Sequence, residues 1–177
     1  QAPRDLCLKK KYAQNGEKVM VHISNFRKVK RVEDVIQVFE QVKKQIPTKL
    51  ILVGDGPEKQ SIERLSKQLN LHHDVIPLGK VADPKEILGL ADLFILPSET
   101  ESFGLSALEA MAMKVPVIST NSGGLPEVNL EGKTGFLSNV GDIQDMSKNS
   151  LKLLKDPVLL EQFRQNAFSQ AMKFDIE

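Results

Sequence analysis

Six short apolar runs constrain the fold of this 177-residue chain more than any other feature. They occupy residues 19–23, 50–53, 75–78, 93–96, 115–118 and, less clearly, 135–137. The runs are continuous rather than alternating, which is typical of parallel strands that are buried on both faces. Loops marked by Gly or Pro and segments with helical spacing lie between them. The pattern predicts an α/β fold with a single doubly wound, Rossmann-like parallel sheet and helices on both of its faces.

The first 17 residues differ from the rest because they are polar and rich in lysine. We expect residues 1–17 to form a lead-in segment with one short helix, and residues 18–172 to form the sheet domain. The sequence begins at Gln1 without a methionine and stops abruptly at Glu177. We therefore expect a piece of a longer protein that has at least two domains.

The charge balance disfavours some classes of protein. The chain has 24 Lys and Arg against 23 Asp and Glu, whereas a general nucleic-acid or polybasic membrane binder needs a basic excess. No apolar stretch is long enough for a membrane span, and the N-terminus lacks the apolar core of a signal peptide. Cys7 is the only cysteine, so we expect no internal disulfide, no structural zinc and a cytoplasmic location. The histidines point to no metal site, and His22 is expected to be an ordinary strand residue.

A basic cluster follows the first apolar run, with four cations in the five positions 27–31. It has three interpretations: a solvated charged surface, a contact with nucleic acid, or a phosphate site. Ligands bind beyond the carboxyl ends of parallel strands, and cations there add to the partial positive charge of the next helix N-terminus. This position favours the phosphate site, and the lack of interleaved aromatic residues disfavours nucleic acid.

A glycine-containing loop, Gly54-Asp55-Gly56-Pro57, follows the second run. It resembles the start of a dinucleotide-binding fingerprint, but Lys59 occupies the position of the third glycine. A nicotinamide-dependent oxidoreductase is therefore disfavoured. A tight turn, in which glycine permits a positive φ and Pro57 opens a helix, explains the loop better.

The segment 101–112, with the sequence ESFGLSALEAMA, carries the most information. We expect a helix that begins near Gly104, with Leu105, Leu108 and Met111 or Ala112 facing the core. Glu109 would then lie at the edge of a buried stripe, where an unpaired charge is costly. Two interpretations stay open for Glu109: a salt bridge to a neighbouring helix, or acceptance of hydrogen bonds from ribose hydroxyls. Glu101 would face a ligand that is held against the free N–H groups of Phe103, Gly104 and Leu105.

These residues resemble a known family. The spacing of Glu101 and Glu109, followed by PVI at 116–118, GGLPEV at 123–128 and TGF at 134–136, resembles the family 4 retaining glycosyltransferases over roughly residues 18–170. The resemblance implies the C-terminal, sugar-nucleotide-binding domain of a GT-B fold, in which two Rossmann-like domains face each other across a cleft. The N-terminal domain, which holds the acceptor, would be absent from this chain. Residues 23–36 and 51–57 are most similar to the branch that joins N-acetylglucosamine to L-malate in bacillithiol synthesis.

The resemblance also implies an activity and a set of site residues. The activity is transfer of N-acetylglucosamine or a related hexose from a UDP-sugar to a hydroxyl of a small hydroxy acid such as L-malate, with retained configuration and no metal or other cofactor. Glu101 would contact the donor sugar, Glu109 the ribose and Lys30 the diphosphate. The N–H groups of Phe103, Gly104 and Leu105 would also contact the diphosphate, and the backbone around Leu78, Gly79 and Lys80 would hold the uracil. A homo-oligomer is also compatible with this class.

The sequence departs from the family pattern at two places. Ser24-Asn25 replaces the usual Gly-Arg, so the family arginine is missing at Asn25 and Arg27 is expected to supply the guanidinium. Lys114 replaces a glycine after a helix, and a left-handed residue other than glycine costs about 1–2 kcal/mol, so we expect a differently shaped turn. Two other classes stay open: a non-catalytic module that binds nucleotide-sugars, and the less favoured nicotinamide oxidoreductase.

Overall fold

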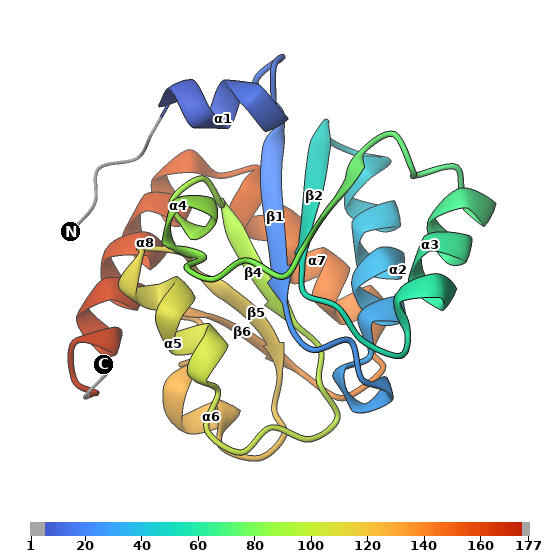
Figure 1. Ribbon diagram of the computed structural model, residues 1–177. Helices are drawn as coiled ribbons and strands as arrows, with labels where there is room; N and C mark the ends of the chain where they lie inside the picture. Colours follow the sequence, from blue (N-terminus) through green and yellow to red (C-terminus); the bar gives the residue numbers. More distant parts are fainter. Residues whose placement is uncertain (1–5, 175–177) are drawn as a thin grey trace.

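Six parallel strands form one sheet in the order β3-β2-β1-β4-β5-β6, as seen in the computed structural model, which describes residues 6–174 (Figure 1). The strands are β1 (Lys18–Ile23), β2 (Thr48–Val53), β3 (Val75–Gly79), β4 (Leu93–Leu96), β5 (Val117–Thr120) and β6 (Gly135–Ser138). This order winds outward in both directions from β1 and β4, so the predicted doubly wound, Rossmann-like sheet is confirmed. All six apolar runs supply a strand, although β5 begins two residues later than its run.

Helices connect the strands and cover both faces of the sheet. They are α1 (Leu6–Tyr12), the 3-10 turn η1 (Lys28–Lys30), α2 (Val32–Lys43), α3 (Lys59–Gln68), α4 (Lys85–Leu88), α5 (Leu105–Ala112), α6 (Leu125–Val128), α7 (Ile143–Leu154) and α8 (Pro157–Ala171). Residues 1–5 of the expected lead-in segment lie outside the described residues, and α1 is the short helix expected within the remainder.

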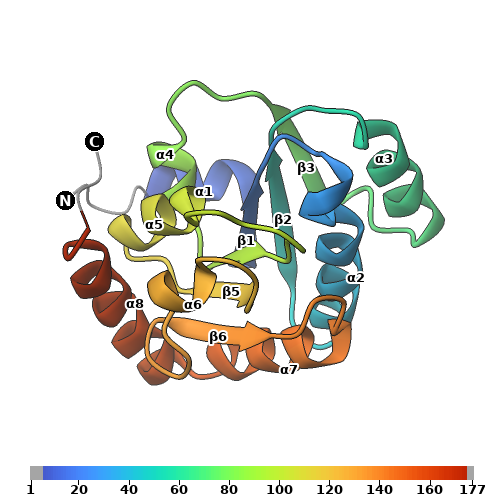
Figure 2. The ribbon, with the colours of Figure 1, turned by 90° about the horizontal axis from the view of Figure 1, so that it is seen from below.

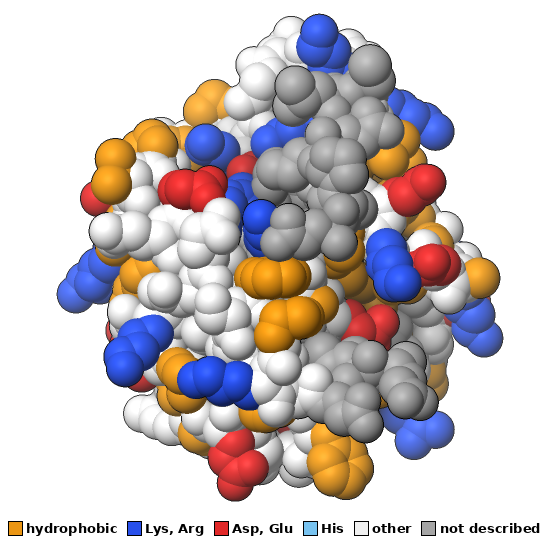
Figure 3. All heavy atoms as spheres, turned by 90° about the vertical axis from the view of Figure 1, so that its left-hand side faces the viewer, with side chains coloured by type: hydrophobic (Ala, Val, Ile, Leu, Met, Phe, Trp, Pro, Cys, Tyr) orange, Lys and Arg blue, Asp and Glu red, His pale blue; other side chains and the backbone are white. Residues whose placement is uncertain are grey.

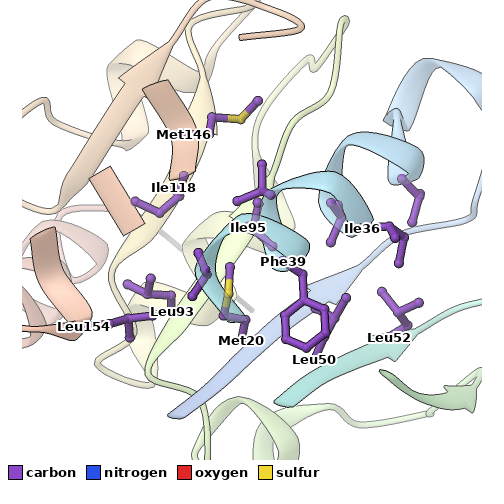
Figure 4. Packing of buried hydrophobic residues seen from close by; sticks show 14 of the residues in the cluster. Met20, Ile36, Phe39, Leu50, Leu52, Leu93, Ile95, Ile118, Met146 and Leu154 are labelled. Carbon is purple, nitrogen blue, oxygen red and sulfur yellow. The ribbon is translucent and has the colours of Figure 1, made fainter. Parts of the chain in front are cut away.

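The sheet separates two apolar clusters, which explains why its strands read as continuous apolar runs. On one face, α2, α3 and α7 pack on side chains such as Met20, Leu50 and Ile95, as Figure 4 shows. On the other face, α4, α5 and α6 pack on the intervening strand residues, and the two helical layers are visible in Figure 2. Successive strand residues point to opposite faces, so both clusters draw on the same strands. Helix α8 contributes to both clusters, with Phe163 on the first face and Ala167 on the second.

The turn after α5 keeps a left-handed shape although it contains Lys114 instead of glycine. Lys114 has a φ of 64°. The N–H of Val115 donates to the carbonyl of Ala110 at 3.1 Å, and the N–H of Lys114 donates to that of Met111 at 3.0 Å. This is the hydrogen-bond pattern of a Schellman motif. The expectation of a differently shaped turn is therefore wrong, because these bonds and that between the Lys114 carbonyl and Arg164, 3.0 Å, hold the residue in place.

The surface agrees with the near-neutral composition. On the face seen in Figure 3, the described Lys and Arg side chains are spread among acidic ones rather than gathered in a basic stripe. Within residues 6–174, no helix is long and apolar enough to span a membrane.

Candidate functional site

The loops after β1 and β4 meet at the carboxyl edge of the sheet and bring Lys30 and Glu101 together. The Nζ of Lys30 donates to Oε2 of Glu101 at 3.0 Å, across 71 positions of sequence. The two side chains are 20% and 12% exposed, so the pair is shielded from much of the solvent. β1 and β4 are neighbouring strands whose chains continue to opposite faces, and this is where open α/β sheets bind ligands. Figure 2 shows the molecule from the side of this carboxyl edge.

His22 supports the loop after β1 from within the core. Its ring is fully buried, Nδ1 lies 2.8 Å from the carbonyl of Ile95, and Nε2 lies 2.8 Å from Oγ of Ser24. The carbonyl can only accept, so the neutral ring donates from Nδ1 and accepts the Ser24 hydroxyl proton at Nε2. Ser24 Oγ in turn accepts from the N–H of Phe26 at 3.2 Å. Burial lowers the pKa of His22 to about 4, which keeps the ring neutral at ordinary pH.

The hydrogen-bonding role of His22 was not predicted from the sequence, where it is expected to be an ordinary strand residue. Its hydrogen bonds join the end of β1 to β4 and fix the loop that leads to Lys30. A polar residue inside an otherwise apolar run, with a hydroxyl two positions later, was the available signal. A buried polar ring requires a partner, and Ser24 is within reach of it.

The two glycines of the loop after β2 allow a close contact with the loop after β1. A Cβ at Gly54 would lie 1.8 Å from the carbonyl oxygen of Ser24, and one at Gly56 would lie 1.8 Å from that of Asn25. Gly54 also has a φ of 134°, which side chains rarely adopt. These glycines thus serve loop packing, in agreement with the tight-turn interpretation rather than a dinucleotide cradle.

The start of α5 exposes apolar side chains and free N–H groups. Gly104 has a φ of 64° and caps the helix, and Phe103 and Leu105 are 80% and 57% exposed. The expectation that Leu105 faces the core is wrong. Leu105 is the first residue of α5, and helical Cα–Cβ bonds tilt toward the N-terminus, so its side chain extends toward the helix end rather than over the turns that pack on the sheet. Leu108 and Met111, farther along, are buried as expected.

The N–H groups of Phe103, Gly104 and Leu105 have no hydrogen-bond partner among residues 6–174. The loop that carries them is supported from β5, because the N–H of Gly124 donates to the carbonyl of Glu101 at 3.0 Å. A Cβ at Gly123 would lie 1.8 Å from the same oxygen, which explains the glycine there. A rigid loop with free donors and the positive end of α5 favours an anion.

Glu109 lies one turn further along α5 and is half-buried. Within the described part of the chain its carboxylate has no ion pair and no side-chain hydrogen bond. The salt bridge that was one of its two interpretations is therefore not found there. A half-buried carboxylate without a protein partner leaves its acceptor oxygens available to a ligand.

The remaining predicted site residues lie further from the Lys30–Glu101 pair. Arg27 is exposed and lines a separate cavity of about 140 Å³ with Arg31 and Glu58. Asn25 is also exposed, and its Oδ1 accepts from the N–H of Arg27 at 3.3 Å. The structure therefore does not bring Arg27 or Asn25 into the pair, although both belong to the same loop.

Leu78 and Gly79 end the edge strand β3, which β2 and β1 separate from β4. The side chain of Leu78 packs on the same apolar cluster as α5, so it lies on the face that carries Glu109. Gly79 has a φ of 69°, and its carbonyl accepts from the N–H of Gly54 at 2.8 Å. Among the described residues, no group of three or more His, Cys, Asp and Glu side chains is placed to hold a metal ion.

Comparison with known proteins identifies relatives of this chain. It is 47% identical over 168 residues to N-acetyl-alpha-D-glucosaminyl L-malate synthase of Bacillus anthracis, an alignment that covers 92% of this chain and 44% of that protein. It superposes with a TM-score of 0.91 and 27% identity on Anabaena Alr3699/HepE, solved in complex with UDP and glucose, covering 99% of this chain and 50% of the other. The C-terminal domain of the Francisella tularensis group 1 glycosyl transferase LpcC shares the fold, with a TM-score of 0.82, 24% identity and coverage of 97% and 94%.

The match extends over nearly the whole of this chain but not of its relatives. The chain spans less than half the length of the first curated relatives it matches. Residues 5–170 match the family described as glycosyl transferases group 1. This range includes every site residue discussed above. The predicted glycosyltransferase resemblance is confirmed, and the chain belongs to the glycosyl transferases group 1 family.

Proposed function

We propose that this chain is the donor-binding domain of a glycosyltransferase that uses a UDP-sugar. The observation that carries the proposal is the pair of Lys30 and Glu101, 3.0 Å apart, directly ahead of the free N-terminus of α5. Lys30 and the N–H groups of residues 103–105 would hold the diphosphate, with no metal required. These contacts strengthen as the leaving diphosphate gains charge, so they lower the barrier to transfer as well as bind the donor.

The two glutamates of the segment 101–112 would hold the two sugars of the donor. Glu109 lies about 6 Å along α5 from its first residue, at a rise of about 1.5 Å per residue. Its unpartnered carboxylate would accept hydrogen bonds from the ribose hydroxyls while the diphosphate occupies the helix end. Glu101 would contact the hydroxyls of the transferred sugar and stabilise positive charge at its reacting carbon. The backbone of Leu78 and Gly79, on the same face as α5, would contact the uracil.

We further propose that the transferred sugar is N-acetylglucosamine, that the acceptor is a small hydroxy acid such as L-malate, and that configuration is retained. The support is the 47% identity to the N-acetyl-alpha-D-glucosaminyl L-malate synthase of B. anthracis. A second domain would hold the acceptor, since positioning two substrates across a cleft can supply about 7–11 kcal/mol of barrier lowering. A cytoplasmic location and a homo-oligomer stay predictions.

Calorimetry and an activity assay test this function in two steps. The chain alone should bind UDP more tightly than uridine, and absence of UDP binding would refute the donor site. The chain should not transfer sugar to malate by itself, whereas the protein with its second domain should release UDP in a malate-dependent way. UDP binding without turnover in that longer protein would favour a non-catalytic nucleotide-sugar-binding module. Binding of NADH in place of UDP would favour the oxidoreductase.

A further inference from the structure

The residue after Lys30 has an unusual backbone conformation. Arg31 has a φ of 52° and a ψ of 48°, and it joins the end of η1 to the start of α2. Residues with a side chain rarely adopt this left-handed conformation, and glycine adopts it without strain. The surrounding structure must therefore hold Arg31 in place.

Backbone hydrogen bonds from Arg31 to Lys28 and from Asp34 to Arg31 contribute to that hold, and the guanidinium of Arg31 adds to it by bridging two carboxylates. Its Nε donates to Oδ2 of Asp34 at 2.7 Å, and its Nη1 donates to Oε2 of Glu99 at 3.4 Å. Asp34 is buried in the first turn of α2, with 8% of its surface exposed. The hydrogen bond with Asp34 is the main reason why the pKa of Arg31 lies above its usual value. The side chain thus connects α2 to the loop that follows β4.

Three links join the η1 segment to the loop after β4. The N–H of Glu99 donates to the carbonyl of Val29 at 2.9 Å, Arg31 pairs with Glu99, and Lys30 pairs with Glu101. In the proposed function, Lys30 turns to the diphosphate and Glu101 to the donor sugar, so the third link opens when donor binds. The other two links involve no proposed donor contact and can persist.

We propose that Arg31 is a positioning residue, whose guanidinium ties the loop after β4 to the η1–α2 turn while Lys30 and Glu101 separate around the donor. The proposal rests on the proposed function. Glu99 is the partner through which Arg31 acts, and Asp34 fixes the guanidinium from the other side. Loss of this clamp, the contact between Arg31 and Glu99, would leave the loop joined to the η1 segment by one backbone bond only, while its bonds to the loop after β5 would remain. The N–H groups of 103–105 would then be less well placed for the diphosphate.

Three substitutions at one position separate the clamp from the backbone conformation. Arg31→Gly relieves the backbone strain but removes the guanidinium, Arg31→Ala removes the guanidinium and keeps the strain, and Arg31→Lys keeps a charge without the two-sided fork. We expect Arg31→Gly to melt at or above the temperature of Arg31→Ala. Both should still exchange the amide proton of Glu99 several times faster than wild type in the unliganded chain. Unchanged exchange in Arg31→Gly would overturn the clamp.

UDP calorimetry on the same variants tests the positioning role. We expect the dissociation constant for UDP to rise about three- to ten-fold in Arg31→Gly, Arg31→Ala and Glu99→Gln, with partial rescue in Arg31→Lys. The dissociation constant for uridine should change less. Glu33→Ala is the matched control, because Glu33 is an exposed carboxylate beside Asp34 that pairs with neither cation, and it should behave like wild type. Full UDP affinity in Arg31→Gly would overturn the proposal.

The two proposals fail in different ways. If wild-type chain does not bind UDP, the proposed function is refuted, and the exchange of the Glu99 amide still decides whether Arg31 holds the loop. If wild type binds UDP and the Arg31 and Glu99 variants match it, only the positioning role is refuted.

Discussion

Replacing Glu101 by glutamine should tighten the binding of UDP, although Glu101 is proposed to serve the transfer. In the unliganded protein the carboxylate of Glu101 forms an ion pair with Lys30 Nζ at 3.0 Å, so the diphosphate must compete with Glu101 for that ammonium group. The Coulomb attraction at this distance is about 5–6 kcal/mol at an effective dielectric constant of about 20. Both side chains retain some exposure, and solvent screening and side-chain ordering reduce the net value to about 1 kcal/mol.

A net interaction of about 1 kcal/mol corresponds to an affinity change of about five-fold. Glu101→Gln keeps the shape and removes the charge, so the dissociation constant for UDP should fall by about three- to ten-fold. Sugar transfer by the protein with its second domain should fall by about a hundred-fold or more, because the contact with the reacting sugar is weakened. Isothermal titration with UDP and an assay of UDP release measure the two effects.

The Lys30→Ala background is the control for this reasoning. If Glu101 acts on UDP by occupying Lys30, its substitution should change UDP affinity much less once the ammonium is gone. An equal gain in both backgrounds would point to general repulsion of the diphosphate instead. A loss of UDP affinity in Glu101→Gln would refute the competition and place Glu101 in direct contact with the nucleotide.

Four further substitutions test Glu109, Lys30, Arg27 and His22. Glu109→Gln should weaken UDP by about 1–3 kcal/mol without unfolding the domain, and calorimetry that finds unchanged affinity with a lower melting temperature would contradict ribose binding. Lys30→Ala should weaken UDP far more than uridine, and Arg27→Ala should have a smaller effect because Arg27 lines a separate cavity; equal losses for uridine and UDP would exclude a phosphate contact. The pKa of His22 is lowered to about 4 in the folded protein, so between about pH 6.5 and pH 4 the unfolded chain binds a proton that the folded chain does not. The free energy of unfolding should therefore decrease as the pH falls through this range. Denaturant titrations at several pH values should show this loss in wild type, and a loss of the same size in His22→Gln would rule out the histidine as its source.

The fold was predictable from the sequence because helices pack on both faces of the sheet. A strand buried on both faces needs apolar side chains at nearly every position, so β4 appears as a continuous apolar run and β1 as one interrupted by His22. The same reasoning failed for Leu105, where helical spacing predicts the core side but the sheet no longer covers the first turn of α5. The spacing of apolar residues predicts which face of a helix packs on the core, but it does not predict at which turn the packing ends.

The site was predictable only in part, because much of it depends on contacts between distant loops. The motif spacing around Glu101 and Glu109 indicated a ligand site, and the adjacent strands β1 and β4 bring Lys30 to it. The bond between Arg31 and Glu99 spans 68 positions, and no spacing rule relates them. The left-handed conformation of Arg31 could not be predicted either, because the usual signal for it is a glycine and the residue at this position is an arginine.

The location of the site follows from the order in which the strands are wound. After β1 the chain passes to α2 on one face, and after β4 it passes to α5 on the other, so the two loops diverge and leave a crevice between neighbouring strands. Two adjacent cations on the first loop, Lys30 and Arg31, meet two glutamates on the second, Glu101 and Glu99. The outer pair, Arg31 and Glu99, is supported by Asp34 and stays attached to the scaffold. Among residues 6–174, no third charged side chain supports the inner pair, so it is the one that a diphosphate at the start of α5 can separate.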